Sequence, residues 1–356
     1  MSYSERMEPG ARIQTGILRQ NRLLCPEHWL MTLEVEAFPT ALPGQFVHLC
    51  PVDLLTRPPS AMEWDSESPP SPCEPASIPP VVIPPTANPG SASSHTGDHS
   101  TRGHRSAMDD PWCSGYPMPL IRRAFSVAGL ARLPHACHVD VIYRVVGTGT
   151  RWMEQLKPGA ALSVLGPLGH PFPDPGDRAA WLVAGGVGLP PLLWMARLLS
   201  AQGRSCTLFY GARSRDLIAL PLESLPLTSA PEEPIRPLVL PGSDAHLVLA
   251  TDDASAGVPG FIDGAMARYC DQNPDFGPAS VRVYTCGPEP MMKAVSERCR
   301  ERGLDCHVCM ERSMACGMGT CQSCVVPVYD PSARDGWRYR LCCTDGPIFS
   351  AQHVRW

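Results

Sequence analysis

Four cysteines near the C-terminal end of this chain have the residue type and spacing of an iron–sulfur site. Cys316, Cys321 and Cys324 follow the pattern C-x4-C-x2-C, and Cys343 lies further on, in Leu-Cys-Cys-Thr-Asp-Gly-Pro. In plant-type [2Fe–2S] clusters, three thiolates come from one tight loop and the fourth from a segment that folds back over it. Such a cluster transfers single electrons, so the rest of the sequence should supply an electron donor and an acceptor.

Other cysteines leave two alternatives open. The chain has 16 cysteines among 356 residues, and free cysteines often serve as small buried hydrophobes. Cys306 and Cys309 form a further C-x2-C pair, and Cys342 adjoins Cys343, so any of these three could replace an assigned ligand. A structural zinc site also uses closely spaced cysteines, although it usually repeats C-x2-C twice. A zinc- or redox-sensing module without turnover is therefore a second hypothesis, which predicts zinc at the cysteines and no flavin.

Composition argues against several classes of partner. The net charge is −5 and the pI is about 6.1, which gives no basic field for nucleic acid. The first residues carry charges and lack the apolar segment of a signal peptide. The uncharged run 179–196 is interrupted by Gly185-Gly186 and Pro190-Pro191, so a membrane span is not expected. The cysteines then fit a reducing compartment. We expect a cytoplasmic protein with no nucleic-acid or membrane partner.

The pattern of apolar residues predicts a multidomain β and α/β protein. Short alternating runs between residues 13 and 49, and again after residue 120, predict antiparallel strands of a small β-barrel. Between them, residues 54–117 are crowded with Pro, Ser, Gly and His and predict a disordered insertion. After Pro175, strands and helices alternate, which predicts a parallel α/β sheet. The expected domains are 1–175 (barrel), 176–304 (α/β) and 305–356 (cluster).

Two glycine-rich turns in the α/β part suit a bound dinucleotide. Gly185, Gly186 and Gly188 lie between a strand and a helix predicted at 190–200. There the backbone can approach a pyrophosphate while the helix N-terminus offers free N–H donors. The turn is not the G-x-G-x-x-G fingerprint, and a tight turn without a ligand fits it equally well. A second turn, Cys286-Gly287-Pro288, follows a later strand, and ligands of open α/β sheets collect at such strand ends.

The barrel part carries two further segments that suit a nucleotide. One is Arg122-Arg123-Ala124-Phe125-Ser126, where an arginine can neutralise phosphate and a serine can hydrogen-bond a flavin ring. The other is the turn Gly147-Thr148-Gly149-Thr150, which can hold a pyrophosphate. Spacing alone is equally compatible with an exposed arginine and an ordinary hairpin.

The order of these motifs resembles the ferredoxin–NADP reductase superfamily. Within it, the sequence is most similar to the family of electron-transfer subunits of NAD-linked dihydroorotate dehydrogenase B. The resemblance rests on Pro43-Gly44-Gln45-Phe46-Val47, Gly166-Pro167-Leu168-Gly169 and the motifs above, and most specifically on residues 314–324 with Cys343-Thr344-Asp345-Gly346-Pro347. It covers nearly all of the chain except residues 54–117. Ala124 departs from the pattern, since the family usually has proline there.

The resemblance implies an FAD-binding barrel, a nicotinamide-binding domain and a [2Fe–2S] domain. The resemblance assigns Cys343, not Cys342, as the fourth cluster ligand. It implies no acid–base catalytic residue in this chain. Flavin contacts are expected from Arg123, Ala124, Phe125, Ser126, Tyr143, Arg144, Val145, Gly147, Thr148, Gly149 and Thr150, and nicotinamide contacts from Gly185, Gly186, Gly188, Cys286, Gly287 and Pro288.

The function implied is electron transfer in pyrimidine (UMP) biosynthesis. An FMN-containing catalytic subunit would oxidise dihydroorotate, and electrons would pass through the cluster and FAD to NAD+. The resemblance implies that the two subunits form a heterotetramer. A reductase subunit of another NAD(P)H complex, such as a ferredoxin–NADP oxidoreductase or a sulfhydrogenase, shares the same three parts. Arg213 and Arg215, after the strand ending at Tyr210, leave the choice between NAD and NADP open.

Overall fold

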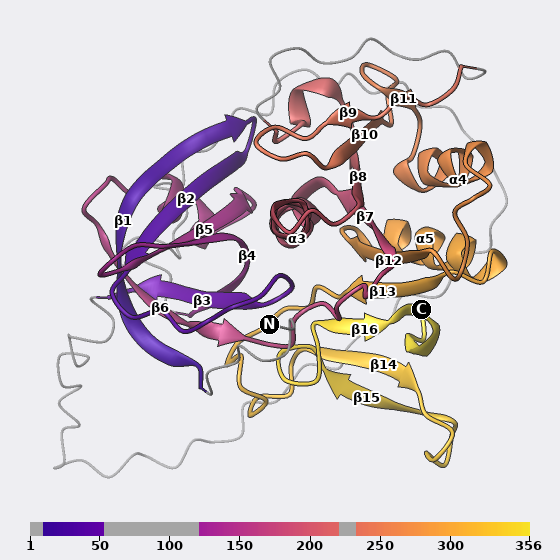
Figure 1. Ribbon diagram of the computed structural model, residues 1–356. Coiled ribbons are helices and arrows are strands. Elements are labelled where there is room, and N and C mark those ends of the chain that lie inside the picture. Colours follow the sequence, from indigo (N-terminus) through magenta and orange to yellow (C-terminus); the bar gives the residue numbers. More distant parts are fainter. Residues whose placement is uncertain (1–9, 53–120, 221–232) are drawn as a thin grey trace, which may run out of the picture. The chain divides into compact units, whose positions relative to one another are not determined.

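The computed structural model describes residues 10–52, 121–220 and 233–356, so the predicted insertion at 54–117 lies outside the described residues. Six antiparallel strands close into a barrel in the order β1-β2-β5-β4-β3-β6 (Figure 1). This confirms the barrel predicted from the alternating runs. The strands are β1 Arg12–Cys25, β2 His28–Val35, β3 Phe46–Pro51, β4 Arg123–Arg132, β5 Cys137–Arg144 and β6 Ala161–Leu168.

The barrel core follows from the two-residue period of its strands. Successive side chains of a strand point to opposite faces. In β5, Val139, Val141 and Tyr143 are buried in one cluster, which Met31 and Leu33 join from the neighbouring strand β2. Local alternation therefore decides which residues fill the barrel.

The second part is a mostly parallel sheet in the order β11-β10-β8-β7-β12-β13-β16. All seven residues of β8 are buried, as expected for a parallel strand covered on both faces. Its elements are β7 Ala179–Gly185, β8 Cys206–Ala212, β9 Leu238–Val239, β10 His246–Thr251, β11 Val258–Pro259, β12 Val281–Cys286, β13 Asp305–Cys309 and β16 Ile348–Ser350.

Helices cover the two faces of this sheet (Figure 1). Two successive residues of β7 show that different helices cover the two faces. Leu182 packs with side chains of α3, and Trp181 packs with side chains of α4 and α5. The helices are α3 Leu189–Ala201, α4 Ile262–Gln272 and α5 Glu289–Glu301. Within the described residues, no helix is both long and apolar enough to cross a membrane.

Two glycine-rich segments begin helical turns. The expected turn at 147–150 opens the short helix α2, Thr148–Glu154, with Gly147 as its extended N-cap. Gly186–Gly188 forms a 3-10 turn, η2, between β7 and α3. Both segments therefore present backbone amides at the start of a helix.

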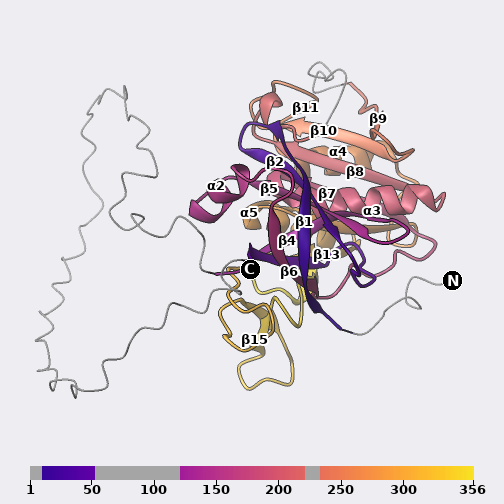
Figure 2. The same ribbon diagram turned by 90° about the vertical axis from the view of Figure 1, so that its left-hand side faces the viewer.

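The C-terminal part contributes to two sheets. Its strands β14 Val325–Tyr329 and β15 Trp337–Leu341 form an antiparallel hairpin, which lies at the bottom of Figures 1 and 2. The later strand β16 pairs antiparallel with β13 at the edge of the α/β sheet. The domain division at residue 304 stays a prediction, but β13 and β16 show that the sheet continues beyond that residue.

The motifs at residues 43–47, 166–169 and 343–347 are far apart in the sequence but meet where the barrel joins the cluster segment. Gln45 Nε2 donates to the carbonyl of Gly169 at 2.9 Å, and the amide of His170 donates to the carbonyl of Gly346 at 2.8 Å. Gly169 has φ +71°, and a Cβ there would lie 2.6 Å from Cδ of Pro347. Only glycine permits this approach, so these motifs fasten the barrel to the cluster segment.

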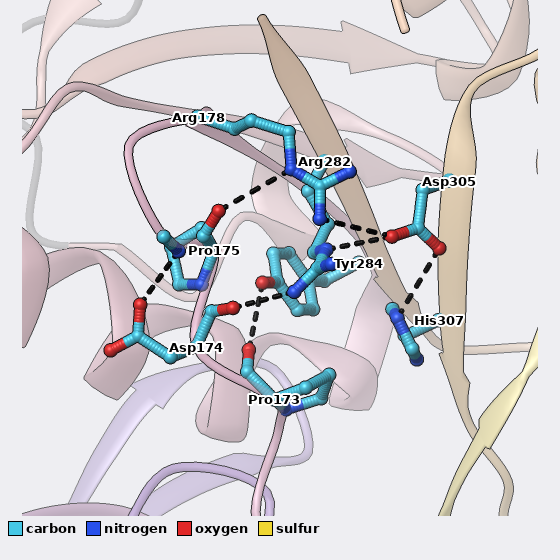
Figure 3. Close-up of polar contacts among 9 residues, drawn as sticks. Pro173, Asp174, Pro175, Arg178, Arg282, Tyr284, Asp305 and His307 are labelled. Carbon is cyan, nitrogen blue, oxygen red and sulfur yellow. Dashed lines mark hydrogen bonds and ion pairs between the residues drawn. The ribbon is translucent and has the colours of Figure 1, made fainter. Parts of the chain in front are cut away.

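The linker after the barrel is held at the start of the sheet (Figure 3). The hydroxyl of Tyr284 donates to the carbonyl of Pro173 at 2.8 Å, and the Arg282 guanidinium donates to the carbonyl of Asp174. Arg282 also pairs with Asp305 at 2.8 Å, and Arg178 reaches the same carboxylate at 3.2 Å. These contacts join the linker to β12 and β13 and thus fix where the sheet begins.

Candidate cofactor sites

The cysteine loop is organised around its sulfur atoms. The amides of Met318 and Cys321 each lie 3.4 Å from Sγ of Cys316 and donate to it. The amide of Cys343 donates to Sγ of Cys324 at the same distance. Amides that point at thiolates stabilise them and tune the cluster that they hold. The loop therefore fits a cluster with the predicted ligands.

The structure separates the two neighbouring cysteines 342 and 343. The thiol of Cys342 donates to the carbonyl of Met310 at 3.0 Å, and its burial raises the pKa of Cys342 well above the usual range. The amide of Cys343 donates to Sγ of Cys324 at 3.4 Å, so Cys343 lies at the loop. Burial, and next the neighbouring Cys324, raise the pKa of its thiol to about 11. This geometry supports Cys343 as the fourth ligand.

The upstream cysteines lie elsewhere. Cys306 and Cys309 belong to β13. The free thiol of Cys306 is hydrogen-bonded to that of Cys299 on α5, and the free thiol of Cys309 to that of Cys286 on β12. All four cysteines are buried. Neither cysteine of β13 is therefore placed to replace a loop ligand.

The donor set suits a two-iron cluster. The three cysteines of the loop and Cys343 supply four thiols. A [2Fe–2S] cluster divides its four thiolates between two irons and so needs pairs of them. The hydroxyl and amide of Ser323, and next Cys316, lower the pKa of Cys321 to about 6, so this exposed sulfur is a thiolate at neutral pH.

A cavity of about 740 Å³ lies between the barrel and the cluster loop. Its volume is in the usual range for cofactor sites. The wall of this cavity opposite the barrel is formed by Met314, Ala315 and Ser323 of the cysteine loop. Of the residues expected to contact flavin, Val145 packs against the barrel core. The others line this cavity, namely Arg123, Ala124, Phe125, Ser126, Tyr143, Arg144, Gly147, Thr148, Gly149 and Thr150.

One end of this cavity suits a pyrophosphate. The Arg123 side chain passes over Gly149, where a Cβ would lie 2.3 Å from its Nε. Thr150 Oγ1 accepts from the amides of Val146 and Gly147 at 2.9 and 3.1 Å. A guanidinium beside a tight glycine turn is an arrangement that binds phosphate groups.

A second cavity, also of about 740 Å³, lies at the carboxyl ends of the sheet strands. Four expected nicotinamide residues line it, namely Gly185, Gly186, Gly287 and Pro288. Gly188 and Cys286 lie behind the lining, and a Cβ at Gly188 would be 2.1 Å from the Cys286 carbonyl oxygen. These two residues allow the two glycine turns to approach each other. Arg213 lines the cavity and Arg215 does not.

The two cavities adjoin. Arg144, Val187 and Glu311 line both of them. Burial raises the pKa of Glu311, which lies directly before the cluster loop. The sequence analysis missed Glu311, whose only signal is its place between a strand and the cysteine motif. A flavin in the first cavity and a nicotinamide in the second would meet beside these residues.

Comparison with known proteins decides the family. The chain is 34% identical over 238 residues to the dihydroorotate dehydrogenase B (NAD(+)) electron transfer subunit of Shouchella clausii, covering 66% of this chain and 80% of the relative. The chain belongs to this family of electron transfer subunits. The corresponding subunit of Desulforamulus reducens is 32% identical, with 67% of this chain and 81% of the relative covered.

Two domain models match within this electron transfer subunit. The iron–sulfur cluster binding domain of dihydroorotate dehydrogenase B matches residues 311–355, and the oxidoreductase NAD-binding domain matches residues 182–297. These matches confirm the iron–sulfur and nicotinamide predictions and the resemblance to this family.

Solved structures confirm the fold. The structure of an NADH-dependent reduced ferredoxin–NADP oxidoreductase is similar with a TM-score of 0.61 at 20% identity, covering 96% of this chain and 90% of that chain. A ferredoxin reductase of carbazole 1,9a-dioxygenase has a TM-score of 0.52 at 18% identity, covering 83% and 67%. The barrel and the sheet therefore have the same fold as these two structures.

Proposed function

We propose that this electron transfer subunit holds [2Fe–2S] at Cys316, Cys321, Cys324 and Cys343, FAD in the first cavity and NAD(H) in the second. The observation that carries the proposal is the order of the three sites. The cysteine loop lines the first cavity, and the first cavity adjoins the second at Arg144, Val187 and Glu311. When bound, these groups supply single-electron and hydride transfer, while the protein sets their positions.

The side chains of the chain have binding and positioning roles in this proposal. Arg123 would neutralise the FAD pyrophosphate, with Gly149 leaving room for the guanidinium. Gly185 and Gly287 would let the backbone approach the NAD pyrophosphate. Tyr143, whose hydroxyl donates to Asn21 at 3.1 Å, would hold the flavin-side wall in place. No acid–base residue is required for these tasks.

The proposed partner is an FMN-containing dihydroorotate dehydrogenase catalytic subunit, in a heterotetramer. The name shared by the relatives, electron transfer subunit, supports such a partner. Electrons from dihydroorotate would reach NAD+ through this chain and so serve pyrimidine synthesis. We propose a cytoplasmic location, because thiol ligands need a reducing compartment until the cluster is assembled.

NAD is the proposed nicotinamide. Arg213 and Asp252 line the same end of the second cavity, since the amide of Asp252 donates to the carbonyl of Ala212 beside Arg213. Desolvation and the neighbouring Asp253 raise the pKa of Asp252, whereas Arg213 lowers it. An acidic side chain accepts hydrogen bonds from the ribose hydroxyls of NAD and repels the 2′-phosphate of NADP. This repulsion offsets the attraction between the arginine and that phosphate.

The test is a spectrum of the anaerobically purified full chain, taken before and after NADH and with the flavin, iron and sulfide contents. We expect flavin and cluster absorption, both bleached by NADH, and dihydroorotate-dependent NAD+ reduction once the catalytic subunit is added. A colourless protein that contains zinc would refute the proposal. Bleaching by NADH, without dihydroorotate-dependent NAD+ reduction after the catalytic subunit is added, would instead favour a role in another reductase complex.

A further inference from the structure

A buried histidine of the barrel has polar atoms without partners. His48 lies in β3 and is fully buried. Among the described residues, neither Nδ1 nor Nε2 of its ring has a hydrogen-bond partner. Burial, and next the charge of Arg122, lower the pKa of His48 to about 4, so the ring is neutral at pH 7. A neutral imidazole has one N–H donor, and burying a donor without an acceptor destabilises a protein.

The ring of His48 faces the cysteine loop. A Cβ built at Gly317 would lie 2.8 Å from Cε1 of His48, 2.9 Å from Nε2 and 3.2 Å from Nδ1. Gly317 directly follows Cys316, whose Sγ accepts the amide of Met318. The polar edge of the imidazole therefore lies against the backbone that surrounds the sulfur atoms, close to where a cluster would be held.

The same histidine adjoins the flavin strand. In the barrel, His48 pairs with Ala124 of β4, and Ala124 lines the first cavity. Cys316 lies 268 residues after His48, so only the folded chain brings the ring between the flavin strand and the cluster loop. Packing alone does not explain an imidazole here, because an apolar side chain would fill the site without orphaned nitrogens.

We propose that His48 donates a hydrogen bond from its imidazole N–H to the sulfur shell of the [2Fe–2S] cluster and thereby raises the reduction potential of the cluster. This inference rests on the proposed function, since it needs the cluster to be present. An N–H···S hydrogen bond withdraws electron density from sulfur and so stabilises the reduced, more negative cluster. His48 is a positioning residue in this role, because the four thiolates complete the iron coordination.

Two variants of similar size separate the hydrogen bond from packing. His48→Gln keeps an N–H donor and His48→Met has none. In the cluster-loaded full chain, we expect a lower midpoint potential in H48M, measured by an EPR-monitored redox titration, and a smaller change in H48Q. The control His138→Met removes an imidazole of β5 that contacts Glu34, and should leave the potential unchanged.

Pulsed EPR on the reduced cluster gives a direct readout. In protein labelled with ¹⁵N-histidine, we expect a weak nitrogen coupling that both H48M and H48Q lose and H138M keeps. Equal potentials in the wild type and H48M, or a coupling that survives in H48M, would refute the role of His48 and leave the electron-transfer proposal intact. Absence of any [2Fe–2S] signal in the wild type would refute both.

Discussion

Two C-x2-C pairs in this chain have the same spacing but lie in different secondary structure. Cys306 and Cys309 belong to a strand, in which residues three apart point to opposite faces. Cys306 accordingly packs in one core cluster and Cys309 in the other, on the two faces of the sheet. Cys321 and Cys324 belong to a glycine-containing loop, where no such alternation separates them. Secondary structure, not spacing, therefore decides whether a cysteine pair can share a metal centre.

The backbone around each pair sharpens the contrast. In the strand, the hydrogen bond to the Cys299 thiol, and next burial, raise the pKa of Cys306 well above the usual range. In the loop, amides donate to sulfur, and Ser323 lowers the pKa of Cys321. Metal ligation needs thiolates, and Cys321 of the loop has a pKa low enough to supply one at neutral pH.

The strongest test of this contrast is loss of the cluster. We expect Cys321→Ser to abolish the cluster absorption and the bound iron and sulfide, because one thiolate ligand is removed. Cys342→Ser should retain both, since that thiol donates to Met310 instead. Equal loss of iron in the two variants would show that the ligand assignment is wrong.

A second test compares a glycine of the cysteine loop with one of the turn between β14 and β15. Gly317 and Gly336 both have φ +73°, but a Cβ at Gly317 would meet the His48 ring and one at Gly336 would meet nothing within 4 Å. Replacing Gly336 by alanine should cost only the backbone term, about 1–2 kcal/mol. Gly317→Ala should cost more and should also lower cluster occupancy. Equal unfolding free energies and equal iron contents would contradict this prediction.

The strand cysteine should show the reverse behaviour. We expect Cys306→Ser to lower the unfolding free energy by about 1–3 kcal/mol, because a hydroxyl replaces a thiol in a buried cluster. Iron content should stay at the wild-type level. Denaturant titration and iron analysis measure the two quantities, and loss of iron without loss of stability would reverse the assignment of the two pairs.

The smallest expected effect is on thiol reactivity in cluster-free protein. A thiol with a lowered pKa is a thiolate above that pKa and becomes protonated as the pH falls through it. With a pKa of about 6, Cys321 should react with iodoacetamide about tenfold faster at pH 7 than at pH 5. Buried Cys306 should remain unmodified in the folded protein. Peptide mass spectrometry distinguishes the two sites, and similar rates at both would contradict the contrast.

Local sequence patterns predicted much of the fold. Alternation of apolar residues gave the barrel strands, and the alternation of strands and helices gave the parallel sheet, because burial on one or both faces leaves a period in the sequence. The helix expected at 190–200 is α3. Helix α4 and the β14–β15 hairpin were not foreseen. The domain limits and the assigned contact residues remain predictions.

The sequence by itself determined the cysteine spacing, the glycine turns and their order, because these are local properties of the chain. Only the tertiary structure decided that Glu311 lies between the two cavities and that His48 lies against Gly317. These contacts join residues that are distant along the chain. Strand register and the packing of separate parts determine them, and neither leaves a periodic signal in the sequence.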